Sequence, residues 1–171
     1  ENRLLKLRKE LSPDEAAQNY VEKIHNILDK NKYQDVQLLS YAIKYASNFY
    51  GPFRDAIGSK KTLKSDKKNY QMDFANSNEA YREVALDIKE GADMVMVKPG
   101  MPYLDVIKSI KENFKIPVLA YQVSGEYSLI KNGIKNNLVN KEAIPESLMC
   151  FKRAGASAIV TYFALEIAKN L

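Results

Sequence analysis

Cysteine, histidine and tryptophan are nearly absent from this chain of 171 residues, which has one cysteine, one histidine and no tryptophan. The single thiol, Cys150, excludes a disulfide within these residues and any metal cage built from cysteines. Cys150 lies in the apolar stretch 148–151, so we expect a buried and inert thiol. His25 has charged neighbours, and we expect it to be solvated and not catalytic.

Long apolar runs are absent too. No stretch approaches the roughly 18 apolar residues of a membrane-spanning helix, and residues 1–3 begin no signal or targeting segment, so we expect a soluble chain without a membrane partner. The net charge of +5 is spread over helix faces and one loop, without interleaved aromatic residues. An anionic small substrate explains this charge as well as nucleic acid does, and we expect no nucleic-acid partner.

What is present is an alternation of strand and helix patterns. Ser12-Pro13-Asp14-Glu15 predicts the start of a first helix. Strands are predicted over 34–43, 92–97, 116–123 and 156–162, and helices over 79–90, 103–113, 141–153 and the last residues. Four strands, each followed by a helix, are typical of a parallel α/β fold. No glycine-rich phosphate fingerprint follows the first strand, which disfavours a dinucleotide-binding sheet.

Two lysines stand at predicted strand ends. Lys98 closes the apolar run 94–97 and is followed at once by Pro99-Gly100, while Lys44 ends the first strand. Burial penalises a charged amine, and a second nearby cation lowers the lysine pKa further. A neutral amine is what Schiff-base formation with a carbonyl requires. We therefore predict amine chemistry here, although the alternative that Lys44 and Lys98 are ordinary solvated charges stays open.

Other polar residues follow strand ends as well, namely Gln122, Ser124 and Tyr162. The carboxyl ends of the strands form the face on which (β/α)₈ barrels build their sites. Only four strands are predicted, which is half of such a barrel. Two simpler readings stay open, because Ser124 suits a helix cap and Arg54 with its aromatic neighbours suits a packed corner.

Six stretches together resemble the porphobilinogen synthase (5-aminolevulinate dehydratase) family of the plant and bacterial magnesium type. They are residues 40–47, 49–56, 70–73, 90–100, 123–127 and 160–162, in order and at family spacing, within a resemblance running from about residue 26 to the C-terminus. That family is a (β/α)₈ TIM barrel, a lyase that condenses two 5-aminolevulinate molecules to porphobilinogen in haem and other tetrapyrrole biosynthesis. The resemblance implies the C-terminal half of this barrel.

The resemblance also implies roles for individual residues. Lys98 would form a Schiff base with the first substrate molecule and Lys44 with the second. The charged loop 59–68 resembles a lid, which would exclude water while the imines persist. The remaining implied contacts are Ser124 and Tyr162 for the first carboxylate, Arg54, Lys67 and Gln71 for the second, and Tyr50 and Phe53 as pocket walls.

Regulation is implied at one further position. Relatives of the magnesium type carry a glutamate where Glu83 stands, and there it binds an allosteric Mg²⁺ mostly through water, at a subunit interface that favours a homo-octamer. A lone carboxylate is adequate for such a site, but a solvated helix glutamate is the simpler alternative. The resemblance leaves a plastid (apicoplast-like) and a cytoplasmic location open.

The N-terminal part departs from the family. We expect residues 1–31 to be a helical lead-in that does not match it, followed by a half-barrel catalytic region over 32–171. The first four strands are missing, and with them the segment that would identify a catalytic metal. Such a half-barrel exposes strand edges and should be unstable unless another chain completes it. Two alternatives stay open: a class I Schiff-base aldolase, which would not need Lys44, and a non-catalytic fragment that assembles with a full-length synthase.

Overall fold

A parallel sheet organises the chain. The computed structural model describes residues 20–56 and 71–169, without the side chain of Arg54. Its sheet has the strand order β1-β2-β3-β4, and all three strand pairs are parallel. The strands are β1 (Leu39–Lys44), β2 (Met94–Lys98), β3 (Val118–Tyr121) and β4 (Ala158–Val160). The predicted parallel α/β arrangement is therefore confirmed.

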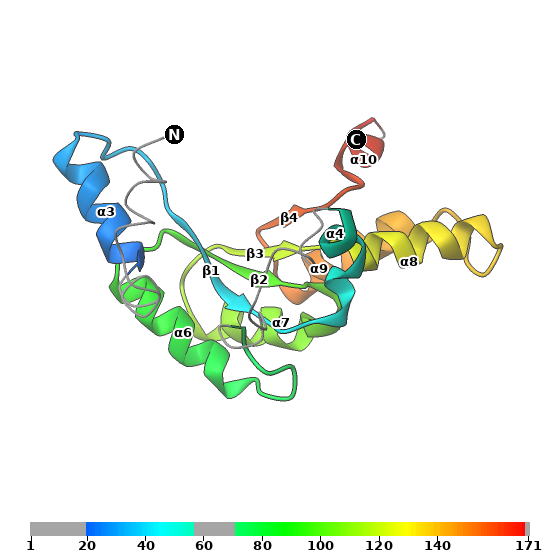
Figure 1. Cartoon of the computed structure of the whole chain (residues 1–171), viewed down its shortest axis with the longest axis horizontal. Coiled ribbons are helices and arrows are strands. Elements are labelled where there is room, and N and C mark those ends of the chain that lie inside the picture. The colour runs from blue at the N-terminus through cyan, green and yellow to red at the C-terminus, as the bar shows by residue number, and fades with distance from the viewer. Residues whose placement is uncertain (1–19, 57–70, 170–171) are drawn as a thin grey trace.

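Helices fill every connection between these strands. The first described element is α3 (Tyr20–Lys30), and β1 is followed by the 3₁₀ turn η1 (Asn48–Tyr50), α4 (Gly51–Ala56) and α6 (Asn78–Lys89). After β2 come η3 (Met101–Tyr103) and α7 (Leu104–Asn113). After β3 come α8 (Ser124–Lys135) and α9 (Ala143–Ala154), and α10 (Ala164–Ala168) follows β4. In Figure 1, α6 and α7 lie below the sheet, while α4 and α8 contact each other on its right-hand side.

The core lies between the sheet and its helices. Val95 and Val97 of β2 are fully buried, and alternation along the strand puts them on the same face. Phe151 of α9 is also fully buried in this cluster. Each such side chain contributes roughly 1.5–3 kcal/mol when it leaves water. Helix residues complete the cluster, among them Val84, Val106, Ile107 and Ile110.

The edge strand β4 is left open within the described part of the chain. Ala158 and Val160 are exposed, and Ile159 is only half-buried. Just beyond the strand, the ring of Tyr162 is 48% exposed. A parallel strand is normally covered on both faces, so this edge has the character expected of a half-barrel.

The strand and helix boundaries differ in detail from those predicted. β1 starts at Leu39 and not at residue 34, because residues 33–36 form a turn in which Val36 N–H donates to the carbonyl of Tyr33. No range was predicted for α8, although Ser124 was named as a possible cap of a helix there, since two glycines and an asparagine dilute its apolar periodicity. Gly91 ends the α6 connection at φ +101°, as its position after the helical pattern predicted. The start of the helix predicted from Ser12 lies outside the described residues.

The predicted exposure of His25 is confirmed, whereas the predicted burial of Cys150 is only partly met. The side chain of His25 is 48% exposed beside Asp29, which confirms the solvated histidine. Cys150 is half-buried and not buried, because its helix face is partly exposed and Arg153 Nη2 donates to its Sγ at 3.4 Å. None of the helices in the described ranges is both long enough and apolar enough to cross a membrane.

Candidate active site

The two strand-end lysines are direct neighbours in the sheet. Lys44 ends β1, Lys98 ends β2, and their Cα atoms are register partners. Register partners in parallel strands point to the same face, so both side chains leave the sheet together. Backbone bonds hold the pair, since the Lys98 carbonyl accepts from Tyr45 N–H at 3.0 Å and the Lys44 carbonyl accepts from Met72 N–H at 2.9 Å.

The surroundings of Lys98 favour a neutral amine. Burial lowers its pKa, and the positive charge of Lys44 lowers it further. Three tyrosine rings surround the ammonium, with centroids 4.1 Å (Tyr121), 5.3 Å (Tyr41) and 5.8 Å (Tyr50) from Nζ. The ring faces attract the cation, yet the pKa remains below its ordinary value. The result is a nucleophile that is more easily deprotonated than a surface lysine.

Ser124 lies at the start of α8, close to α4. Its hydroxyl is buried and accepts a hydrogen bond from Phe53 N–H at 3.1 Å. Val123, not Ser124, occupies the N-cap position of α8. The bond from Phe53 uses an acceptor lone pair of Ser124, so the hydroxyl proton remains available to donate elsewhere.

Tyr162 and Tyr121 connect β4 to the lysines. Tyr162 lies beyond the end of β4 and hydrogen-bonds the side chain of Tyr121, whose ring is the one nearest to Lys98 Nζ. Burial and the neighbouring Tyr162 raise the pKa of Tyr121, so its phenol keeps its proton. Tyr162 was predicted from the sequence and Tyr121 was not, although strand alternation could have placed Tyr121 on the Lys98 face.

Gln71 lies beside the Lys44 strand end. The next residue, Met72, forms an isolated bridge with Tyr45. The Oε1 atom of Gln71 is buried and has no hydrogen-bond partner within the described part of the chain. A buried amide oxygen without a partner suggests a position that a donor group of a ligand completes. Its Nε2 is the group that can donate to a carboxylate.

Of the other predicted substrate contacts, only Tyr50 is seen close to Lys98 in the described part of the chain. Tyr50 is buried, and its hydroxyl donates to the Lys98 carbonyl at 3.1 Å, so it stabilises the strand end as well as facing the amine. Phe53 is 49% exposed on α4. The Arg54 backbone belongs to α4. Lys67 and the predicted lid 59–68 lie outside the described residues.

A buried carboxylate that the sequence analysis missed lies between the strand-end loops. Glu126, in the first turn of α8, is 2% exposed. Its Oε1 accepts from Met101 N–H at 2.6 Å, and its Oε2 accepts from Val123 N–H. Burial raises the pKa of Glu126 to about 7, although these backbone donors favour the carboxylate. Glu126 belongs to the stretch 123–127 that carries the family resemblance, but no role was predicted for it from the sequence.

Gln122, the strand-end amide singled out in the sequence, is structural. It is fully buried, donates from Nε2 to Ser147 Oγ at 3.0 Å, and accepts from Thr161 Oγ1 at 2.6 Å. These bonds occupy both ends of its amide and join β3 to α9 and to the end of β4. The amide therefore stabilises the sheet and is not presented to a ligand.

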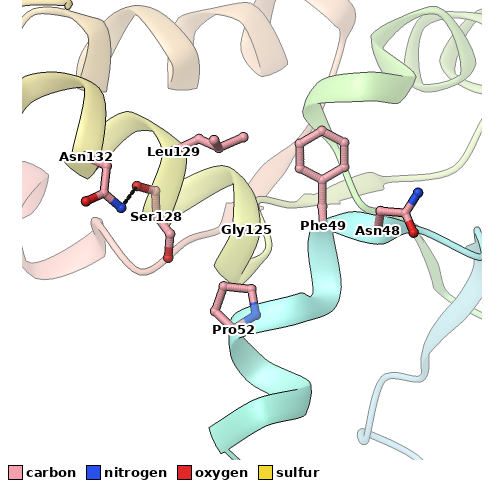
Figure 2. Close-up of a pocket in the computed structure, with 7 residues that line it drawn as sticks. All are labelled: Asn48, Phe49, Pro52, Gly125, Ser128, Leu129 and Asn132. Carbon is pink, nitrogen blue, oxygen red and sulfur yellow. Dashed lines mark hydrogen bonds between the residues drawn. The ribbon is translucent and has the colours of Figure 1, made fainter.

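A pocket of about 310 Å³ lies next to this site, between η1, α4 and α8. Figure 2 shows its walls, with Phe49 and Leu129 on opposite sides and Asn132 bonded to the backbone of Ser128. Gly125 is required there, because a Cβ on it would lie 2.3 Å from the Phe49 carbonyl oxygen. The lining residues are Asn48, Phe49, Pro52, Gly125, Ser128, Leu129 and Asn132. They carry no cation, so the pocket does not suit an anionic substrate.

Glu83 lies on α6, half-buried and away from the strand ends. Burial raises its pKa, the nearby Asp87 and Glu79 raise it further, and Arg82 opposes them. Repulsion among carboxylates is relieved by a divalent cation. In the described ranges no group of three or more acidic, histidine or cysteine side chains is arranged to hold a metal. These described residues form no cage of protein ligands, so a Mg²⁺ at Glu83 would have to keep most of its water ligands.

Comparison with known proteins supports the same family. The family model described as delta-aminolevulinic acid dehydratase matches residues 9–170. This match starts well before residue 26, where the resemblance was expected to begin. A dehydratase of this name from Bradyrhizobium diazoefficiens is 55% identical over 162 residues, covering 94% of this chain and 46% of that protein. One from Archaeoglobus fulgidus is 49% identical, covering 94% and 50%.

A solved structure agrees with the fold. The crystal structure of delta-aminolevulinic acid dehydratase (porphobilinogen synthase) from Toxoplasma gondii ME49, in complex with the product porphobilinogen, matches with a TM-score of 0.84 and 50% identity. It covers 88% of this chain and 43% of the other. The expected fold, part of a TIM barrel with four parallel strands, is confirmed. The chain spans about half the length of these relatives, and it belongs to the delta-aminolevulinic acid dehydratase family.

Proposed function

We propose that this chain supplies the C-terminal half of a porphobilinogen synthase, with both amines that bind the two 5-aminolevulinate molecules. The observation that carries the proposal is the register pairing of Lys44 with Lys98 at the ends of adjacent strands. Two neighbouring amines can hold two ketones side by side, which a condensation of two identical substrates requires. A class I aldolase needs only one such lysine, so the pair favours the condensation.

The chemistry begins at Lys98. Its neutral amine attacks the ketone carbon of 5-aminolevulinate, a C–N bond forms, and the carbonyl oxygen leaves as water to give an imine. The lowered pKa of Lys98 raises the fraction of amine that has a free lone pair. Lys44 carries out the same step on the second molecule once it has lost its own proton. Before that, burial first and the positive charge of Lys44 second lower the Lys98 pKa.

The carboxylates are held by hydroxyl and amide donors. Ser124 has its hydroxyl proton available, because Phe53 N–H occupies one of its lone pairs. Tyr162 lies on the same side through its bond to Tyr121. We assign these two to the first substrate, and Gln71, Arg54 and Lys67 to the second. Phe53 and Tyr50 complete the walls, and the loop 59–68 is proposed as the lid.

The test measures the rate at which the full-length protein and two single variants, Lys98→Met and Lys44→Met, form porphobilinogen. We expect the Lys98 variant to lose at least about 1,000-fold in kcat, since its covalent step is removed. A matched control, Lys108→Met on the exposed face of α7, should retain activity. Full activity of either active-site variant would contradict the proposal.

The catalytic form is proposed to include another half of the barrel. The exposed β4 edge, with Val160 and Tyr162, supports this view, because such an edge needs a neighbouring strand. A chain without that half is the non-catalytic fragment considered above, and mixing it with a full-length synthase would test whether it assembles.

We also propose an allosteric Mg²⁺ at Glu83 that favours a homo-octamer. Acidic neighbours that raise the Glu83 pKa support it, since the cation would offset their repulsion. The matched pair is Glu83→Gln and Glu142→Gln, the latter an exposed glutamate on another element. Native mass spectrometry with and without Mg²⁺ should show loss of the metal-dependent octamer only for Glu83→Gln. The location stays a two-way proposal, plastid or cytoplasm; the rice relative is named as chloroplastic.

A further inference from the structure

The Glu126 carboxylate joins two loops that come from different strands. Its Oε1 accepts from Met101 N–H at 2.6 Å, and Gly100 N–H also hydrogen-bonds the carboxylate. Its Oε2 accepts from Val123 N–H. Gly100 and Met101 follow Lys98, and Val123 precedes Ser124. The carboxylate thus links the loop after the proposed amine to the start of the helix that carries the proposed carboxylate donor.

Helix capping explains only part of this arrangement. The bond from Val123 satisfies a free N–H at the start of α8, as a capping glutamate does. The bonds from Gly100 and Met101 come from a separate loop, 25 residues away for Met101. They contribute nothing to the end of α8. Helix capping alone therefore does not explain why the N–H groups of Gly100 and Met101 bond to this carboxylate.

The Lys98 loop has little freedom to move independently. Pro99 and Gly100 are buried, and a Cβ on Gly100 would lie 2.3 Å from the Phe151 ring. On the other side, Tyr45 N–H and Tyr50 Oη bond the Lys98 carbonyl. Loss of the Glu126 bonds releases one end of a short, tightly packed segment, and the displacement reaches the strand end that carries the amine.

On the basis of the proposed function, we propose that Glu126 is a positioning residue that fixes the span between the Lys98 amine and the Ser124 hydroxyl. It touches no substrate. It keeps the amine and the hydroxyl at a separation that suits a ketone and a carboxylate of one molecule. The pKa of the Tyr103 phenol is raised by burial first, then by Asp105 and Asp73, and last by Glu126.

The test compares two ketones that differ in the carboxylate. Levulinate carries both groups, whereas butanone has only the ketone. In the full-length protein and in Glu126→Gln, each ketone is trapped on Lys98 with borohydride, and peptide mass spectrometry follows the rate. The glutamine keeps the volume but turns one acceptor into a donor that faces backbone N–H groups. We expect trapping of levulinate to slow roughly 10-fold to 100-fold, and trapping of butanone to change less than about twofold.

The control is Asp93→Asn. Asp93 Oδ2 accepts from Leu38 N–H at 2.7 Å, so it is also a carboxylate that joins two backbone segments, but at the opposite end of β1 and β2. In Asp93→Asn, the ratio of the trapping rate of levulinate to that of butanone should equal the ratio in the unchanged protein. Equal slowing of both ketones in Glu126→Gln, or no slowing of either, would show that Glu126 is only a cap and would overturn the proposal.

A second measurement separates this proposal from the proposed function. Labelling by acetic anhydride, followed against pH, reports the pKa of Lys98 without any substrate. Loosening the loop should let the amine reach water and move from Lys44, so the Lys98 pKa should rise in Glu126→Gln toward its ordinary value. If 5-aminolevulinate gives no adduct in the unchanged protein, the proposed function fails. A shift of the labelling curve would still support the positioning role, and an unchanged curve would overturn it.

Discussion

Lys44 and Lys98 are register partners at the carboxyl ends of adjacent parallel strands, and the charge of Lys44 adds to burial in lowering the Lys98 pKa. Strand alternation puts both amines on one face, while the backbone of each strand end is held by bonds from Met72 and Tyr45. The pairing therefore results from the sheet and not from flexible side chains that happen to meet. It makes the chemical state of one lysine depend on the other.

Removing the charge of Lys44 should raise the pKa of Lys98. Burial is the larger cause of the lowered Lys98 pKa and the charge of Lys44 is the smaller one. Lys44→Met should therefore raise this pKa only part of the way to its ordinary value. Amine labelling against pH measures it, and the Lys98 midpoint should move to higher pH. Lys108→Met, on exposed α7 surface, should leave the midpoint in place. A midpoint that moves downward in Lys44→Met would show that the electrostatic account of the pair is wrong.

Stability should depend on pH through Glu126. Its pKa is raised from 4.5 to about 7, so between these values the folded state binds a proton that the unfolded state has lost. The free energy of unfolding should therefore fall as pH rises through this window, by an amount on the order of 3 kcal/mol, and level off above it. Urea unfolding of Glu126→Gln against pH should lack this decline. Parallel pH curves for the two proteins would contradict the assignment.

Gly125 and Gly100 should not tolerate a side chain. A Cβ would lie 2.3 Å from the Phe49 carbonyl oxygen at Gly125, and at the same distance from the Phe151 ring at Gly100. Either Gly→Ala change should lower the free energy of unfolding by about 1–3 kcal/mol. Gly51→Ala is the matched control, because nothing lies within 4 Å of its Cβ position. Thermal unfolding of the three variants is compared. A loss of stability in Gly100→Ala and Gly125→Ala but not in Gly51→Ala indicates overpacking and not the replacement of glycine as such.

Phe151 should contribute strongly to stability. Its ring is fully buried in the main core, on the helix α9, which packs against α7 and β4. Phe151→Ala should cost about 3–5 kcal/mol through lost burial and the cavity left behind. Leu165→Ala, at a residue 82% exposed, should change the free energy of unfolding by less than about 0.5 kcal/mol. Similar costs at the two positions would mean that the core is placed wrongly.

The parts of the fold that depend on local pattern were predictable. The apolar run ending at Lys98 and the breaker Pro99-Gly100 predicted β2 and the position of its amine. The alternation of strands with helices predicted the parallel sheet and, with four strands, the half-barrel. These features depend on residues close together in sequence, where periodicity and turn chemistry carry the information.

The features that were missed depend on contacts between distant segments. Glu126 looked like an ordinary helix-start residue, because its partner Met101 is 25 residues away. Alternation along the strand could have placed Tyr121 on the Lys98 face, but its distance from the amine depends on the pairing of β2 with β3. α8 was missed since its stability comes from packing against η1 and α4, and not from a strong apolar stripe. The roles of Lys67, Arg54 and the loop 59–68 stay predictions.

The most direct test of the account is to locate the adducts that 5-aminolevulinate forms with the full-length protein. Borohydride reduces each imine to a stable secondary amine, and peptide mass spectrometry identifies the lysine that carries it. The account predicts adducts on Lys98 and on Lys44, with the Lys98 adduct formed first. Adducts on neither residue, or on exposed lysines such as Lys108 at equal rates, would contradict it.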